Sequence, residues 1–233
     1  IYQSPRPVSG FEEVSEASVK ALTAKASGRS RSRYYKKILD GLELFRRSGR
    51  LLDLGCASGG FLQAAGEAGW EAVGIEISDK LAGIGRGRGL DIRTGDITEI
   101  KLPDSHFDVA VLNMVIEHLP SPTMTMEELY RVIRPGGAVW IHTPNYSSTT
   151  IKNNPTTENY PGGHLCCFTP KTLLQLCDKT GFDVKRIHTI GFRSAGPRRT
   201  WRKPFEKFAS LVLRPLGRGY RIKALAVKRR YPK

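Results

Sequence analysis

A strand-like apolar run that leads into a glycine-rich turn constrains the fold of this chain more than any other feature. The run reads Leu51-Leu52-Asp53-Leu54-Gly55-Cys56-Ala57-Ser58-Gly59-Gly60-Phe61-Leu62. The glycines allow a tight turn and let the backbone approach a ligand closely. A helix that starts after the turn presents its free N–H groups to that ligand. The pattern therefore predicts a ligand site at the end of a buried strand.

A dinucleotide-binding turn is the nearest alternative, and its spacing does not fit. That motif needs G-x-G-x-x-G after a strand, whereas the chain has Gly55-x-Ala57-x-Gly59-Gly60. The carboxylate of Asp53 would repel a pyrophosphate and attract a cationic ligand such as a sulfonium with an ammonium group.

Four more segments follow the turn in an order that is typical of a parallel sheet with crossover helices. They are residues 71–78, 90–97, 107–119 and 131–141. Together the five segments resemble the motifs of the class I S-adenosylmethionine (SAM)-dependent methyltransferases, with Ala57 in place of a third glycine. The resemblance covers roughly residues 34–190 and points to the small-molecule O-methyltransferases, such as those of quinone biosynthesis.

The resemblance implies an α/β fold, namely a Rossmann-like, doubly wound, seven-stranded sheet. The sheet is expected to be mostly parallel, with an antiparallel last strand and helices on both faces. The implied cofactor is SAM, which leaves as S-adenosylhomocysteine. The implied cofactor-binding residues are Tyr34, Asp53, Gly55, Cys56, Ala57, Ser58, Gly59, Phe61, Glu76, Ile77, Gly95, Asp96, Ile97, Asn113 and Met114.

The same resemblance assigns a part of the cofactor to each group of residues. Residues 53–59 would cradle the methionine part, with Tyr34 or Tyr35 at its carboxylate, and core packing stays open as the role of either tyrosine. Glu76 would accept the ribose hydroxyls, because an acidic residue at the end of the second strand can accept both. Asp96 and Ile97 would bind adenine, and residues 113–114 would line the approach to the sulfonium.

The acceptor is expected to be a hydroxyl on a small molecule. Removal of a hydroxyl proton benefits from a general base, and the candidates are His164, His118, His142 and Glu117, ranked with His164 first and His118 second. A structural role for each histidine stays open. The segments that bind an exocyclic amine or supply a Pro-Cys nucleophile are absent, and residues 143–163 form the expected substrate loop. Thr169 and Pro170 are expected to cap a helix over residues 171–180.

The four cysteines show no metal-ligand spacing, and no metal site is expected. Cys56, Cys166, Cys167 and Cys177 lack a C-x-x-C pattern and are expected to be reduced intracellular thiols.

The distribution of charge is the second informative feature. The net charge is +15, and residues 191–233 contribute 14 basic residues and 1 acidic residue. This asymmetry indicates an anionic partner, either RNA, a lipid surface or a phosphorylated substrate. An RNA methyltransferase and a non-catalytic SAM-binding module therefore remain as alternatives.

The chain is expected to have two parts. Residues 1–48 would form a helical cap on the substrate side, and residues 49–233 would form the methyltransferase domain, with a basic helix (201–213) and last strand (219–228) at its end. The helix is expected to pack over the active site, with a position on a membrane surface as the alternative. No apolar run approaches 18 residues, and a cytoplasmic location, peripheral at a membrane if lipid binds, is expected. The first residue is Ile1, and the resemblance leads us to expect a further segment upstream.

Overall fold

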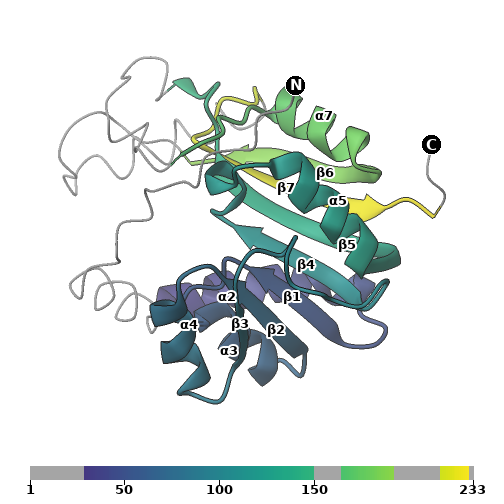
Figure 1. Cartoon of the computed structure of the whole chain (residues 1–233). Helices are drawn as coiled ribbons and strands as arrows, with labels where there is room; N and C mark the ends of the chain where they lie inside the picture. The colour runs from purple at the N-terminus through teal and green to yellow at the C-terminus, as the bar shows by residue number, and fades with distance from the viewer. Residues whose placement is uncertain (1–28, 150–163, 192–215, 231–233) are drawn as a thin grey trace, which may run out of the picture.

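One mixed sheet organises the protein in the computed structural model, which describes residues 29–149, 164–191 and 216–230. The strand order is β3-β2-β1-β4-β5-β7-β6, so β3 and β6 lie at opposite edges (Figure 1). The strands are β1 (Arg50–Leu54), β2 (Glu71–Glu76), β3 (Asp91–Thr94), β4 (Phe107–Asn113), β5 (Ile133–Pro144), β6 (Phe182–Ile190) and β7 (Arg221–Lys228).

Strand direction matches the expectation from the sequence. The pairs β1–β2, β2–β3, β1–β4 and β4–β5 are parallel. Only β7, among the described strands, runs against its neighbours β5 and β6. The doubly wound sheet with an antiparallel last strand is confirmed.

Helices cover both faces of this sheet. They are α2 (Arg29–Leu42), α3 (Gly60–Glu67), α4 (Asp79–Arg86), α5 (Pro122–Val132) and α7 (Pro170–Lys179), with short 3-10 turns η1 (Glu43–Phe45) and η2 (Ile116–His118). Side chains of α5 and α7 pack in one apolar cluster with Leu52 of β1. Side chains of α2 and α3 pack in another with Leu51. Alternate residues of one strand thus serve opposite faces, as the pleat dictates.

Helix boundaries follow local chemistry. The predicted cap of α7 is confirmed, because Thr169 Oγ1 accepts a hydrogen bond from Thr172 N at 3.2 Å and Pro170 follows at the first helical position. Ser78 caps α4 in the same way, accepting from Leu81 N.

The segment Pro135-Gly136-Gly137 corrects an expectation. The sequence predicts a turn between a helix and the fifth strand, but these residues lie inside β5, which begins directly after α5. Pairing with β4 jumps from Phe107–Ile133 to Val109–Ala138, so the three residues form an irregularity in the strand. A Cβ at Gly137 would lie 2.6 Å from the Asp108 carbonyl oxygen, which explains the glycine.

Several expectations fall on residues that the structure does not describe. They concern the helix at 201–213, the first part of the cap, and most of the loop at 143–163. No helix within the described ranges is long and apolar enough to cross a membrane. The division at residue 48 stays a prediction, although α2 shares an apolar cluster with β1 and β4.

Candidate cofactor and methyl-transfer site

A cavity of about 460 Å³ lies where β1, β2, β3 and β4 end. Chain connections leave β1 toward β2 and β4 toward β5, so the strand order reverses beside this edge. Ligands of doubly wound sheets bind at such a reversal, outside the carboxyl ends of the strands. Eight predicted site residues line the cavity, namely Gly55, Glu76, Ile77, Gly95, Asp96, Ile97, Met114 and His118.

The glycine-rich turn has the left-handed backbone that its sequence predicts. The φ angles are 68° at Gly55, 51° at Ala57 and 81° at Gly59. A Cβ at Gly55 would lie 2.5 Å from a methyl carbon of Val115, and one at Gly59 would lie 2.4 Å from Leu90 Cδ1. A side chain at either position would have to displace these neighbours and would be strained by the positive φ angle, which explains the two glycines.

Glu76 connects this turn to the second strand. Its Oε2 accepts a hydrogen bond from Ala57 N at 2.8 Å, and its Oε1 accepts one from Ser78 N at 2.9 Å. Each carboxylate oxygen can accept a further bond. Glu76 therefore fixes the wall of the cavity and retains capacity for ligand hydroxyls.

Asp53 is buried in β1 and does not line the cavity. Burial, and to a smaller extent the charge of Glu76, raises its pKa well above the usual range. A carboxyl group in this state gains from a nearby cation, because a positive charge offsets the cost of desolvating the carboxylate. The site thus fits the cationic end of the implied cofactor.

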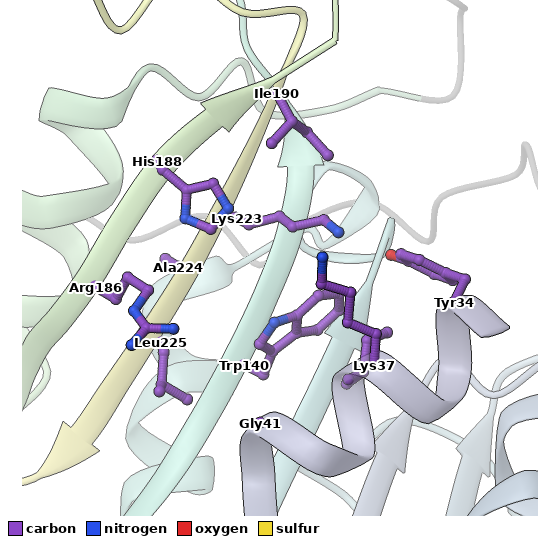
Figure 2. Close-up of a pocket in the computed structure, with 11 residues that line it drawn as sticks. Tyr34, Lys37, Gly41, Trp140, Arg186, His188, Ile190, Lys223, Ala224 and Leu225 are labelled. Atoms are coloured by element: carbon purple, nitrogen blue, oxygen red, sulfur yellow. The ribbon is translucent and has the colours of Figure 1, made fainter. Parts of the chain in front are cut away.

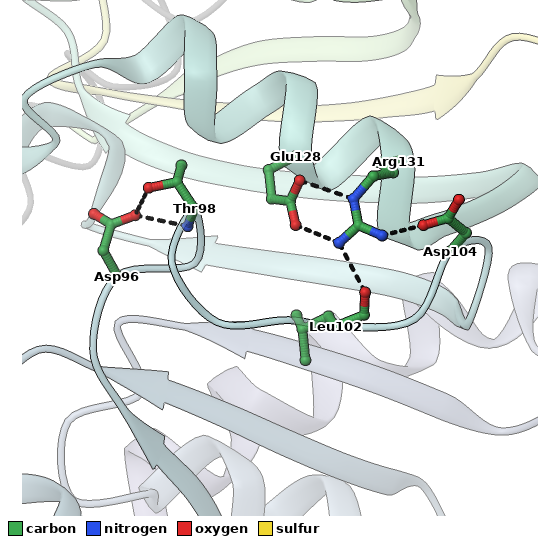
Figure 3. A network of polar contacts seen from close by, with 6 residues as sticks. All are labelled: Asp96, Thr98, Leu102, Asp104, Glu128 and Arg131. Carbon is green, nitrogen blue, oxygen red and sulfur yellow. Dashed lines mark hydrogen bonds and ion pairs between the residues drawn. The ribbon is translucent and has the colours of Figure 1, made fainter.

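The loop after β3 carries the residues predicted to bind adenine. Asp96 Oδ1 accepts hydrogen bonds from the backbone and hydroxyl of Thr98, which shapes the start of the loop (Figure 3). Arg131 of α5 holds the far end of the loop through Leu102 O and Asp104. Ile97 is buried and lines the cavity, so one apolar wall and one carboxylate face the same space.

Tyr34 and Asn113 lie outside the lining of this cavity. The hydroxyl of Tyr34 donates to Asn113 Oδ1 at 3.2 Å and lies 2.8 Å from His142 Nδ1. His142 is buried, and burial, together with the charges of Arg221 and Lys223, lowers its pKa to about 3. His142 is therefore neutral at physiological pH and supports the end of β5.

Three other predicted cofactor residues place their side chains in the core. Cys56 packs with Leu62, Ala82 and Ile92, and Phe61 lies edge-on to Tyr35, with ring centroids 5.3 Å apart. Ser58 is buried as well. These residues shape the turn, and any contact with a ligand would come from their backbone.

The predicted catalytic residues lie together beside the cavity. The rings of His118 and His164 have centroids 4.7 Å apart, although the two residues are distant in sequence. The carbonyl oxygen of Glu117 accepts hydrogen bonds from Leu165 N and Cys166 N at 2.8 and 3.0 Å. This backbone pairing joins the segment that carries His164 to the end of β4.

Glu117 is fully buried, and its Oε2 accepts a hydrogen bond from Thr143 at 2.9 Å. Burial raises the pKa of this carboxyl. One ligand atom each of Glu117, His118 and His164 lies within 4.8 Å of the others, a donor set that could hold a divalent cation. The prediction that no metal is needed stays untested.

Sequence reasoning missed Tyr146, whose hydroxyl is hydrogen-bonded to Nδ1 of His164. Burial lowers the pKa of His164, and the charge of His118 lowers it further. His164 is thus neutral near pH 7, and if its Nδ1–H donates to Tyr146, its Nε2 can accept a proton. The sequence could have indicated this residue, because Tyr146 stands two positions after the end of β5, at the same edge of the sheet as the cofactor turn.

Comparison with known proteins gives the class of this site. A family model described as a methyltransferase domain matches residues 27–187. The chain belongs to the SAM-dependent methyltransferase family. A probable SAM-dependent methyltransferase of Mycolicibacterium smegmatis is 32% identical over 155 residues, which cover 65% of this chain and 58% of that protein.

Other similar proteins agree on the class and the fold. A ubiquinone biosynthesis O-methyltransferase of Methylococcus capsulatus is 33% identical over 105 residues, 42% of this chain and 44% of that protein. The methyltransferase chain thus spans about half the length of these relatives. A SAM-dependent methyltransferase from Archaeoglobus fulgidus has the same fold, with a TM-score of 0.66 at 21% identity over 90% of this chain and 99% of that one.

Proposed function

We propose that this methyltransferase transfers the methyl group of SAM to a hydroxyl oxygen of a small molecule. The observation that carries the proposal is that the cofactor cavity adjoins the candidate base. His118 lines the cavity and also contacts His164. The O-methyltransferase similar to this chain supports oxygen as the acceptor atom.

The residues of the cavity would bind the cofactor in three parts. The turn at Gly55 would hold the methionine end, with buried Asp53 behind it attracting the positive charge, Glu76 would hold the ribose and Asp96 the adenine amine. When bound, SAM supplies a methyl group on a sulfonium, from which a neutral thioether leaves readily. The protein then mainly has to align the acceptor with this methyl group and exclude water.

His164 would remove the acceptor proton. Its Nε2 accepts the proton while Tyr146 holds Nδ1, and His118 packs edge-on to the ring. Loss of this proton would make the acceptor oxygen a better nucleophile toward the methyl group that bound SAM would supply. Glu117 is fully buried, whereas His164 is only partly buried, so we assign Glu117 a positioning role for the two histidines rather than direct contact with substrate.

Methyl transfer to a panel of hydroxylated phenols, aromatic acids and sugars tests this proposal. His164→Ala should lower kcat/KM about 100-fold or more, the usual contribution of a general base, while S-adenosylhomocysteine affinity stays unchanged. His106→Ala is the matched control, because His106 lies at the opposite end of β4 beside Arg50. Activity that survives His164→Ala with an unchanged pH profile would refute the assignment of the base.

An RNA acceptor is the second candidate, and it is favoured by the charge of residues 191–233. RNA binding through that segment should weaken steeply as salt rises. Methylation of small hydroxylated compounds without RNA would exclude it. A non-catalytic SAM-binding role would be indicated by tight cofactor binding without transfer to any acceptor class.

A further inference from the structure

A second cavity, of about 310 Å³, lies between α2 and the strands β5, β7 and β6 (Figure 2). It shares no lining residue with the cofactor cavity. Its ceiling comes from one face of α2, where Tyr34, Lys37, Ile38 and Gly41 recur at helical spacing.

The sheet supplies the floor of this cavity through two rows of paired residues. Leu225 of β7 is paired with Trp140 of β5 and with Arg186 of β6. One step along, Lys223 is paired with His188 of β6. Directly paired residues project from the same face of a sheet, so the topology brings these side chains under α2.

Three cationic side chains line the cavity, namely Lys37, Arg186 and Lys223. No carboxylate lines it, and none of the three forms an ion pair within the described part of the chain. Figure 2 shows the side chains of Lys37 and Lys223 reaching into the same space between α2 and the sheet. Like charges held together without a counter-charge are unfavourable, and an anion would relieve this cost.

Lys223 is held in place by aromatic rings. Its Nζ lies 4.7 Å from the ring centroid of Tyr34 and 5.8 Å from that of Trp140. Cation–π contacts fix the ammonium group without neutralising its charge. Burial, and then the charges of Lys37 and Arg221, lowers the pKa of Lys223, in agreement with a site that lacks a negative group.

Gly41 leaves room in the wall. A Cβ built at this helical position meets no atom within 4 Å. Gly41 lies in the last turn of α2, and the absence of a side chain there leaves the cavity open.

We propose that this cavity binds the phosphate group of a small anionic molecule. Lys37, Arg186 and Lys223 contact the phosphate oxygens, and the planar guanidinium of Arg186 can bind two of them at once. Trp140 and Leu225 form an apolar wall for a small organic group attached to the phosphate. The volume is near the lower limit for ligand pockets, which fits a compact molecule and not a polymer strand. The inference goes beyond the proposed methyl transfer, because it uses none of its residues.

Calorimetric titration of the full chain with inorganic pyrophosphate at low salt tests the site. The wild type should bind one pyrophosphate per chain. Lys37→Gln and Arg186→Gln should each weaken binding about tenfold, as expected for loss of one charge-assisted hydrogen bond. The neighbours supply matched controls, since Lys36 pairs with Asp40 on α2 and Lys185 precedes Arg186 on β6, and neither lines the cavity. Lys36→Gln and Lys185→Gln should change the affinity less than twofold.

A variant that fills the cavity separates the site from general surface charge. Gly41→Leu should abolish pyrophosphate binding while the thermal unfolding temperature and S-adenosylhomocysteine affinity stay at wild-type values. A titration with phenyl phosphate distinguishes the source of the phosphate, because tighter binding than that of inorganic phosphate shows that the apolar wall takes part, whereas equal binding indicates a free phosphate ion.

Three outcomes would overturn the proposal. One is the absence of saturable binding of both pyrophosphate and phenyl phosphate. Another is equal loss of affinity in the cavity and control variants, which would indicate a diffuse basic surface that binds polyanions such as RNA. The third is unchanged pyrophosphate binding in Gly41→Leu.

Discussion

Asp53 shows how a single residue can lower the stability of the fold and still favour the binding of a cationic ligand. Its carboxyl group is buried at the end of β1, and burial and the charge of Glu76 raise its pKa. A raised carboxyl pKa contributes stability when the group is protonated, at low pH, and this contribution is lost as the pH rises through the folded-state pKa. Buried Asp53 therefore lowers the stability of the cofactor-free protein at every pH above the pKa that this carboxyl has in the unfolded chain.

Asp53→Asn should raise the free energy of unfolding at pH 8 by on the order of 1 kcal/mol, and the gain should shrink as the pH falls toward 5. The same change should weaken SAM binding. Urea unfolding at several pH values measures the first effect, with Asp91→Asn on exposed β3 as control. A variant that is less stable than wild type at pH 8 would contradict this account.

Ala57 carries the cost of a left-handed backbone, with φ at 51°. Ala57→Gly should leave the free energy of unfolding within about 1 kcal/mol of wild type, because relief of strain offsets the greater freedom of the unfolded chain. Ala57→Val should lower it by about 1–3 kcal/mol, since a branched residue fits this conformation poorly. Thermal unfolding of both variants provides the comparison, and equal stability of the two would refute the strain at this position.

Residue types and spacing were the best guide to the lining of the cofactor cavity at positions where the backbone faces the cavity, as at Gly55 and Gly95. They failed to separate residues that line the cavity from residues that pack behind it, such as Phe61 and Cys56. The direction of a side chain at the start of a helix depends on packing across the sheet. The spacing of apolar residues within one segment does not predict that packing.

At the scale of elements, Asp108 connects three segments. Its Oδ2 accepts hydrogen bonds from the backbone N–H groups of Arg47, Ser48 and Gly49 at 2.8, 2.8 and 2.7 Å. Its Oδ1 accepts one from Arg134. Burial alone would raise the pKa of this carboxyl, but Arg134 and the backbone N–H groups outweigh burial and hold the pKa below its usual value.

Asp108→Asn should lower the free energy of unfolding by about 3 kcal/mol, because it leaves Arg134 and backbone donors without a charged partner. The contribution of Asp108 is present above the unfolded-state pKa, near 4, and is lost as the pH falls below it. Asp104→Asn is the control, since Asp104 is 76% exposed and exposed ion pairs contribute less than about 1 kcal/mol. Equal effects of the two changes would contradict the role of Asp108.

Strands and helices were predictable where apolar runs ended in clear signals, as at Gly69 after α3 and Thr169 before α7. The irregularity at Gly136 and Gly137 was not. A Pro-Gly-Gly sequence is typical of a turn. Here it forms an irregularity within β5, where Gly137 lies against the Asp108 carbonyl oxygen. Such an effect arises from a neighbouring strand.

At the scale of the whole molecule, strand order decides where chemistry takes place. The reversal between β1 and β4 gathers the ends of four parallel strands, and the cavity at this edge is lined by the ends of β1 and β2 and by the loops that follow β3 and β4. The antiparallel insertion of β7 between β5 and β6 creates the second, basic cavity on a face of the same sheet. Family motifs predicted the first cavity, whereas the second depends on cross-strand pairing and on α2, which carry no motif.

The central claim is that the cavity at the strand ends binds the adenosyl cofactor through Glu76. Titration calorimetry of the chain with S-adenosylhomocysteine, with NAD as control ligand, tests it most directly. We expect micromolar affinity, about −8 kcal/mol, no binding of NAD, and a loss of at least tenfold in Glu76→Gln, with Glu71→Gln at the exposed start of β2 unchanged. Equal affinity of Glu76→Gln and wild type, or wild-type binding of NAD in place of the adenosyl ligand, would contradict the account.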